Sequence, residues 1–103
     1  MTRIDKLKEL LIANSTDSFL QHALALEYIK ENNDKNAKYL FESILEKEPS
    51  YVGSYYHLGK LLERNNEKFK AIIIYKKGMN EAKVIKDNHS YNELKGALED
   101  LED

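Results

Sequence analysis

The chain has no cysteine among its 103 residues, and it has only one proline and four glycines. Without cysteine it can form neither a disulfide framework nor a thiolate metal site, and a reducing compartment, the cytoplasm, fits best. Scarce proline and glycine in a strongly charged chain favour helices, and no segment alternates apolar and polar residues as a strand would. We therefore expect one all-α domain spanning residues 1–103.

Long apolar runs and an excess of one charge are also missing. Purely apolar stretches last a few residues, as in Ala71–Ile74, and the N-terminal sequence MTRIDKLKEL lacks the apolar centre of a signal peptide. We therefore predict no membrane partner. Sixteen basic residues stand against 18 acidic ones, and the net charge of −2 argues against a nucleic-acid partner, which would need a basic footprint.

A repeat with a period of 34 residues is present. Small residues recur at Ala25 and Gly59 and again at Ala37 and Ala71, which would let two helix backbones approach closely. Large residues recur beside them. The matching pairs also include Leu24 with Leu58, Tyr28 with Leu62, Asn32 with Asn66, and Phe41 with Tyr75.

This pattern resembles the tetratricopeptide repeat, whose signature is W-x-x-L-G-x-x-Y, then A-x-x-x-F, then P. The resemblance covers Ser18 to about Lys83. It implies a right-handed α-α superhelix of antiparallel helix pairs. Three positions depart from the signature: Gln21 replaces an aromatic residue, Gly78 replaces alanine, and Lys83 replaces the terminating proline, so the second helix of the second repeat is expected to be long.

About six helices are expected, over residues 3–13, 17–32, 34–47, 51–65, 67–86 and 91–102. Residues 1–16 would form a half-repeat helix, 17–50 the first repeat, 51–86 the second repeat, and 87–103 a C-terminal capping helix. Expected N-terminal caps are Thr2 with Asp5, Asp34, Ser50, and Ser90 with Glu93.

The family's first helices line a concave groove that binds peptides, so the resemblance implies a set of groove residues here. They are Phe19, His22, Leu26 and Ile29 in the first repeat, and Tyr56, Lys60, Glu63 and Arg64 in the second. His22, Leu26 and Ile29 form an apolar stripe separate from the core stripe, which favours a contact surface. The alternative is that the N-terminal helix folds over Leu26 and Ile29. Lys60 is the one basic residue at the positions of the family's carboxylate clamp, so that clamp is not expected.

The leading functional hypothesis is a scaffold that binds another protein or a peptide, without cofactor or metal. The alternative is a self-assembling protein, a homo-oligomer held through Ile72 and Ile73 or through the ends of the stack. The competing interpretation of those isoleucines is burial beneath Leu94 and Leu98 of the last helix. A metal-dependent enzyme, with His22 and His57 as ligands, is a distant third, because no catalytic motif is present and we expect no enzyme.

Overall fold

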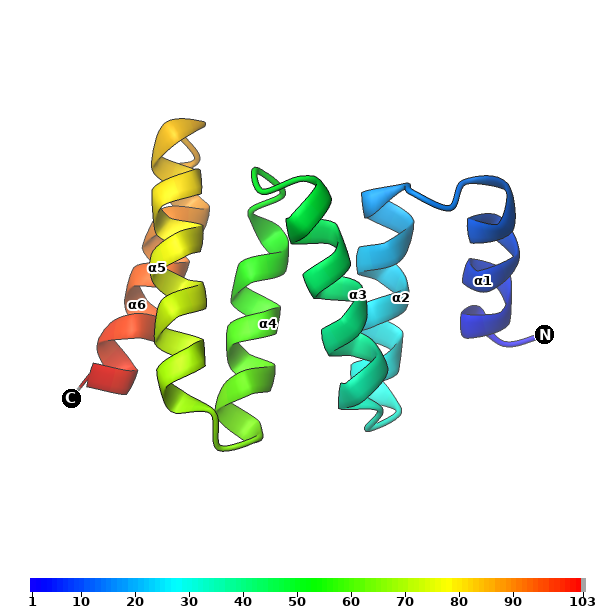
Figure 1. The fold of residues 1–103 in the computed structure, drawn as a ribbon, viewed down its shortest axis with the longest axis horizontal. Helices are drawn as coiled ribbons and strands as arrows, with labels where there is room; N and C mark the ends of the chain where they lie inside the picture. Colours follow the sequence, from blue (N-terminus) through cyan, green and yellow to red (C-terminus); the bar gives the residue numbers. More distant parts are fainter. Residues whose placement is uncertain (103) are drawn as a thin grey trace. The chain divides into compact units, whose positions relative to one another are not determined.

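The computed structural model describes residues 1–102, which form six helices and contain no strand. In Figure 1 they are α1 (Arg3–Ala13), α2 (Ser18–Lys30), α3 (Asp34–Lys47), α4 (Gly53–Arg64), α5 (Lys68–Val84) and α6 (Asn88–Glu102). The prediction of an all-α fold with six helices is confirmed. The largest difference in a helix start is at α6, which begins at Asn88 rather than at residue 91. None of these helices is both long and apolar enough to cross a bilayer.

The chain divides into two compact units, one from Met1 to Glu48 and the other beginning at Pro49. In the first unit, α2 and α3 form an antiparallel pair with Ala25, Ala37 and Phe41 fully buried. Helix α1 packs on α2 through Leu7, which is 6% exposed. At the other end of the pair, Lys47 Nζ donates to Ser18 Oγ (2.6 Å), which donates to a Glu48 carboxylate oxygen (2.8 Å).

The second unit contains α4, α5 and α6, and α5 packs against both of the others. Helices α4 and α5 approach closely at two glycines. A Cβ atom on Gly59 would lie 2.1 Å from the ring of Tyr75, and one on Gly78 would lie 2.6 Å from Cβ of Tyr55. Gly78 is therefore required by the neighbouring tyrosine, although the sequence shows it only as a departure from the repeat.

At the corresponding contact between their two helices, the two repeats use opposite combinations of residue sizes. One period before Tyr55 stands Gln21, and one period before Gly78 stands Ile44, which is fully buried. The first repeat thus combines a smaller residue on its first helix with a larger one on its second, whereas the second repeat does the reverse. Each helix pair keeps a filled interior in this way, because voids and overlaps are both destabilising.

Three helices end in the same left-handed turn. Asn32, Asn66 and Lys86 have φ angles of 59°, 61° and 61° after α2, α4 and α5. In each turn the next residue donates its backbone N–H to a carbonyl five residues earlier, as in Asn33 to Tyr28 (2.8 Å) and Asp87 to Ala82 (2.9 Å). This is the Schellman motif, which satisfies the last carbonyl groups of a helix.

Three of the predicted N-terminal caps are wrong, as the observed first residues of the helices show. Asn33 rather than Asp34 caps α3, accepting the Asn36 N–H at 3.3 Å. Helix α4 starts at Gly53, three residues after Ser50, with no side-chain cap. The Asp87 carboxylate accepts the Ser90 N–H at 3.0 Å, so Ser90 lies inside α6. The capping box of Thr2 and Asp5 is confirmed.

Candidate functional site

Helix α4 presents three of the predicted groove residues as one connected set. Lys60 Nζ lies 5.6 Å from the centroid of the Tyr56 ring and 3.6 Å from a carboxylate oxygen of Glu63. The side chains of Lys60 and Glu63 are 37% and 24% exposed. The ammonium group is thus held between an aromatic face and a carboxylate while part of it still contacts solvent. Arg64, the fourth predicted residue, is exposed at the end of the helix.

Tyr75 of α5 holds Glu63 in place, a role that the sequence pattern did not predict. Its ring is buried at the phenylalanine position of the repeat, and its hydroxyl group donates to the Glu63 carboxylate. Burial, together with the bonded carboxylate, raises the pKa of Tyr75. The available signal was the change from Phe41 in the first repeat to tyrosine here, because the added hydroxyl needs a polar partner when buried.

Helix α2 carries the other four predicted groove residues on one side. At about 100° per residue, Phe19, His22, Leu26 and Ile29 fall within about 80° of one another around the helix axis. Phe19 is 69% exposed, and the other three are half-buried. The His22 ring meets Phe41 edge-on, with centroids 5.6 Å apart. His22 therefore contributes to packing, and the three apolar residues supply the contact surface.

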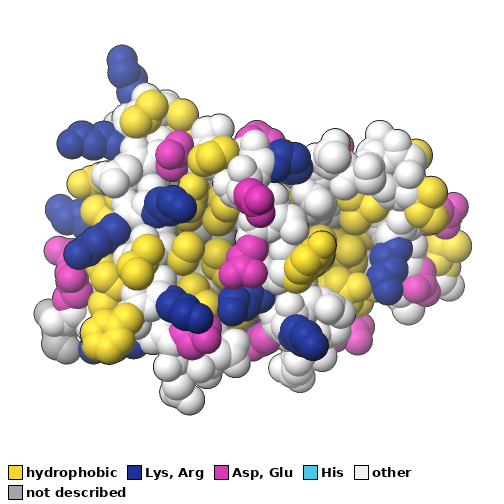
Figure 2. Space-filling view, viewed as in Figure 1, with side chains coloured by type: hydrophobic (Ala, Val, Ile, Leu, Met, Phe, Trp, Pro, Cys, Tyr) yellow, Lys and Arg dark blue, Asp and Glu magenta, His cyan; other side chains and the backbone are white. Residues whose placement is uncertain are grey.

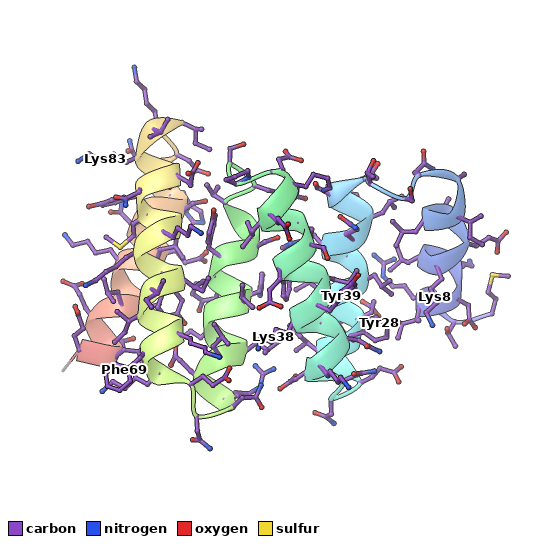
Figure 3. All side chains as sticks on the ribbon, in the orientation of Figure 1. Lys8, Tyr28, Lys38, Tyr39, Phe69 and Lys83 are labelled. Carbon is purple, nitrogen blue, oxygen red and sulfur yellow. The ribbon has the colours of Figure 1, made fainter. Side chains whose placement is uncertain are left out.

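Helix α1 contacts a different side of α2. Arg3 Nε lies 3.4 Å from the Glu27 carboxylate, and Lys8 Nζ lies 5.9 Å from the centroid of the Tyr28 ring (Figure 3). Leu26 and Ile29 are each at least about 100° around the helix from these two residues. The contacts of α1 therefore do not account for the partial burial of Leu26 and Ile29, as the alternative in which this helix folds over them would require.

His57 adjoins the connected set of α4 through the ring of Tyr56. Its ring meets that of Tyr56 edge-on at 5.6 Å, and its surroundings include the carboxylate of Glu93 in α6. Burial lowers the pKa of His57, while the charge of Glu93 acts in the opposite direction. Within residues 1–102, no three His, Asp or Glu side chains are close enough together to hold a metal ion.

Solved structures resemble this chain over most of its length. A crystal structure of a tetratricopeptide repeat domain protein from Salinibacter ruber is 41% identical and covers 84% of this chain and 96% of its own, with a TM-score of 0.80. A solution structure from Bordetella parapertussis (21% identity, TM-score 0.84, 98% and 88% covered) and a crystal structure of MamA protein (22%, 0.72, 95% and 56%) share the fold.

Neither a model of a known protein family nor a protein with curated annotation matches the chain. The evidence for its relationship is therefore the identity to the Salinibacter ruber domain, together with the two helix pairs built on the 34-residue period. On this evidence the chain belongs to the tetratricopeptide repeat family.

Proposed function

We propose that this protein is an interaction scaffold that binds a segment of another protein through the exposed side of α4, and that the apolar side of α2 is a contact surface of its own. The observation that supports this proposal most strongly is the connected set Tyr56, Lys60 and Glu63 on α4. A side chain needed only for packing would be buried, yet all three keep solvent contact, even though Glu63 is bonded to the buried Tyr75 of α5. We propose no catalytic role and no cofactor, and a cytoplasmic location.

The chemistry of the two helices indicates the kind of segment that would bind. Lys60 offers an ammonium group to a carboxylate of the partner, and the Tyr56 ring beside it offers a flat apolar surface. On α2, Phe19, Leu26 and Ile29 suit one or two apolar anchors. A segment with an acidic residue beside a hydrophobic one fits α4, and a segment with hydrophobic side chains fits α2; such peptides bind by anchor residues on preformed surfaces.

A random peptide library, selected on the wild-type protein, tests the proposal. We expect enriched peptides to carry an acidic residue near hydrophobic ones. The double variant Tyr56→Ala with Lys60→Glu should bind them at least about tenfold more weakly, because it removes the ring and reverses the charge. Far-UV circular dichroism should show unchanged helicity, since both residues are partly exposed.

The matched control is Tyr39→Ala with Lys35→Glu, which makes the same chemical changes at exposed positions of α3. This control should bind the selected peptides as the wild type does. If the α4 double variant also kept full affinity, the assignment of the site to α4 would be wrong.

A further inference from the structure

Helix α5 carries apolar side chains on the side opposite its buried side. Its buried residues are Ala71, Tyr75, Gly78 and Ala82. Phe69, Ile73 and Val84 are 82%, 62% and 78% exposed. At about 100° per residue, these three lie on the far side of the helix from the buried line. The prediction that α6 covers the isoleucines is wrong for Ile73, because Leu94 and Leu98 are buried elsewhere and leave it open.

Lysines flank this exposed line, which we call the outer face of α5. The helix has five lysines and one acidic residue, Glu81. Around the axis, Lys76 and Lys83 lie on one side of the apolar line, and Lys70 and Lys77 lie on the other. Figure 2 shows basic and apolar side chains interleaved over this helix, with Phe69 and Lys83 near its two ends in Figure 3.

Few carboxylates neutralise the outer face. Lys70 pairs with Glu67 at 3.5 Å and Lys76 with Glu102 at 3.9 Å, but these lysine side chains remain 65% and 59% exposed. Among residues 1–102, Lys77 and Lys83 have no carboxylate partner. The outer face therefore combines exposed hydrophobic side chains with positive charge that is free to meet an external anion.

We infer that the outer face of α5 binds the surface of an anionic lipid bilayer. Phe69, Ile73 and Val84 enter the boundary between headgroups and acyl chains, and the flanking lysines extend their stems outward to the lipid phosphates. Each lysine near an anionic surface strengthens binding, and the attraction is screened by salt. The contact lies on the surface only, which is compatible with the lack of a membrane-spanning helix in residues 1–102.

Charge and shape favour a bilayer over two protein partners. Pairing two copies of the chain through this face would set the four flanking lysines of one copy against those of the other, which is unfavourable. An acidic helix of another protein would need a groove to receive it, whereas the outer face is the convex side of a single helix. A lipid surface is anionic and deformable, so it accommodates a ridge.

Vesicle sedimentation tests the inference with the whole chain. We expect the protein to sediment with vesicles of phosphatidylglycerol and phosphatidylcholine in equal amounts, and not with phosphatidylcholine alone. Raising the salt concentration to about 0.5 M should release it, because the Debye length then falls to about 4 Å. Phe69→Ser with Ile73→Ser should weaken binding by about tenfold or more, and Lys76→Glu, Lys77→Glu and Lys83→Glu together should abolish it.

Two further variants separate this face from other surfaces. Ile12→Ser with Lys6→Glu and Lys35→Glu removes an exposed apolar side chain and reverses two exposed lysines elsewhere, and it should bind vesicles as the wild type does. Tyr56→Ala with Lys60→Glu should also bind normally, so failure of the proposed peptide site would not affect this result.

Absence of wild-type binding to the anionic vesicles would overturn the inference. Equal losses in the control and outer-face variants would do so as well. A third outcome that contradicts it is binding of an acidic amphipathic peptide to the outer face without any binding to vesicles, which would assign the face to a protein partner.

Discussion

At the scale of single residues, the closest packing in the molecule depends on Gly59. A Cβ atom there would overlap the Tyr75 ring, which is fully buried and has no free space to enter. We expect Gly59→Ala to lower the free energy of unfolding by about 1–3 kcal/mol, the usual cost of overpacking a core. Urea denaturation followed by circular dichroism measures this change.

Gly96 provides the control, because it lies within α6 and a Cβ atom there would have no neighbour within 4 Å. Gly96→Ala should raise the free energy of unfolding by about 0.5–1 kcal/mol, since alanine restricts the unfolded chain and suits a helix. A Gly59→Ala variant as stable as the wild type would contradict the role given to the ring of Tyr75, and a destabilised Gly96→Ala variant would contradict the expectation for an open helical position.

The sequence predicted part of this packing. The repeat placed small residues at positions 25, 37, 59 and 71, and all four are buried. It did not predict that Gly78 makes room for Tyr55. The first repeat has Gln21 and Ile44 at the corresponding positions, so the change in residue size is shared between two positions on different helices. The bond from Tyr75 to Glu63 was also missed, since a repeat pattern treats phenylalanine and tyrosine as equivalent.

At the scale of helices, one residue often serves two neighbours. Asn33 completes the turn after α2 and also caps α3. In the same way, Asp87 completes the turn after α5 and caps α6. The predicted caps Asp34 and Ser90 were wrong because suitable polar side chains occur at several consecutive positions. The length of the preceding turn selects among them, and this length depends on backbone geometry that the side-chain pattern does not encode.

The turn after α5 is the weakest of the three left-handed turns. Its left-handed position is occupied by Lys86, whereas the other two use asparagine, which tolerates this conformation better. We expect Lys86→Gly to raise the free energy of unfolding by about 0.5–1 kcal/mol, because relief of the backbone strain exceeds the added entropy of the unfolded glycine. Thermal and urea unfolding both measure this gain.

Lys83→Gly is the comparison within the same lysine-rich segment. Lys83 lies in the last turn of α5, where the backbone is helical, so glycine there should lower the free energy of unfolding by about 1 kcal/mol. If the two substitutions changed stability in the same direction, backbone strain at Lys86 would not be the cause.

At the scale of the whole molecule, the sequence predicted the class of fold, and it suggested candidate contact residues without their contacts or exposure. It placed Tyr56, Lys60 and Glu63 on one helix side, and the structure adds that they form a connected set. It grouped His22 with the contact residues, whereas Phe41 holds that ring at the edge of the core. Exposure was hardest to predict, as at Ile73, because it depends on which side of α5 the neighbouring helices cover.

The titratable groups of the molecule predict that the free energy of unfolding is highest at intermediate pH and falls along an acid limb and an alkaline limb. Burial lowers the pKa of His57 below its ordinary value of 6.5, so the unfolded chain takes up the proton first and stability falls as the pH drops below about 6.5. Asp87 has a lowered pKa because it accepts bonds from Ser90, and its contribution is lost at still lower pH. Burial raises the pKa of Tyr55 from 10.0 to about 12, so stability falls again as the pH rises from about 10 to 12.

Free energies of unfolding from urea titrations across this pH range test both limbs. His57→Gln should make the acid limb shallower between pH 6.5 and about 5, because the variant has no imidazole to protonate on unfolding. Tyr55→Phe should be less stable at neutral pH, since it loses the bond from the hydroxyl to the Pro49 carbonyl (2.7 Å), but it should lose less on going above pH 10. Unchanged slopes in these variants would mean that other groups control the pH dependence, and that burial of the second unit's aromatic and imidazole side chains does not set it.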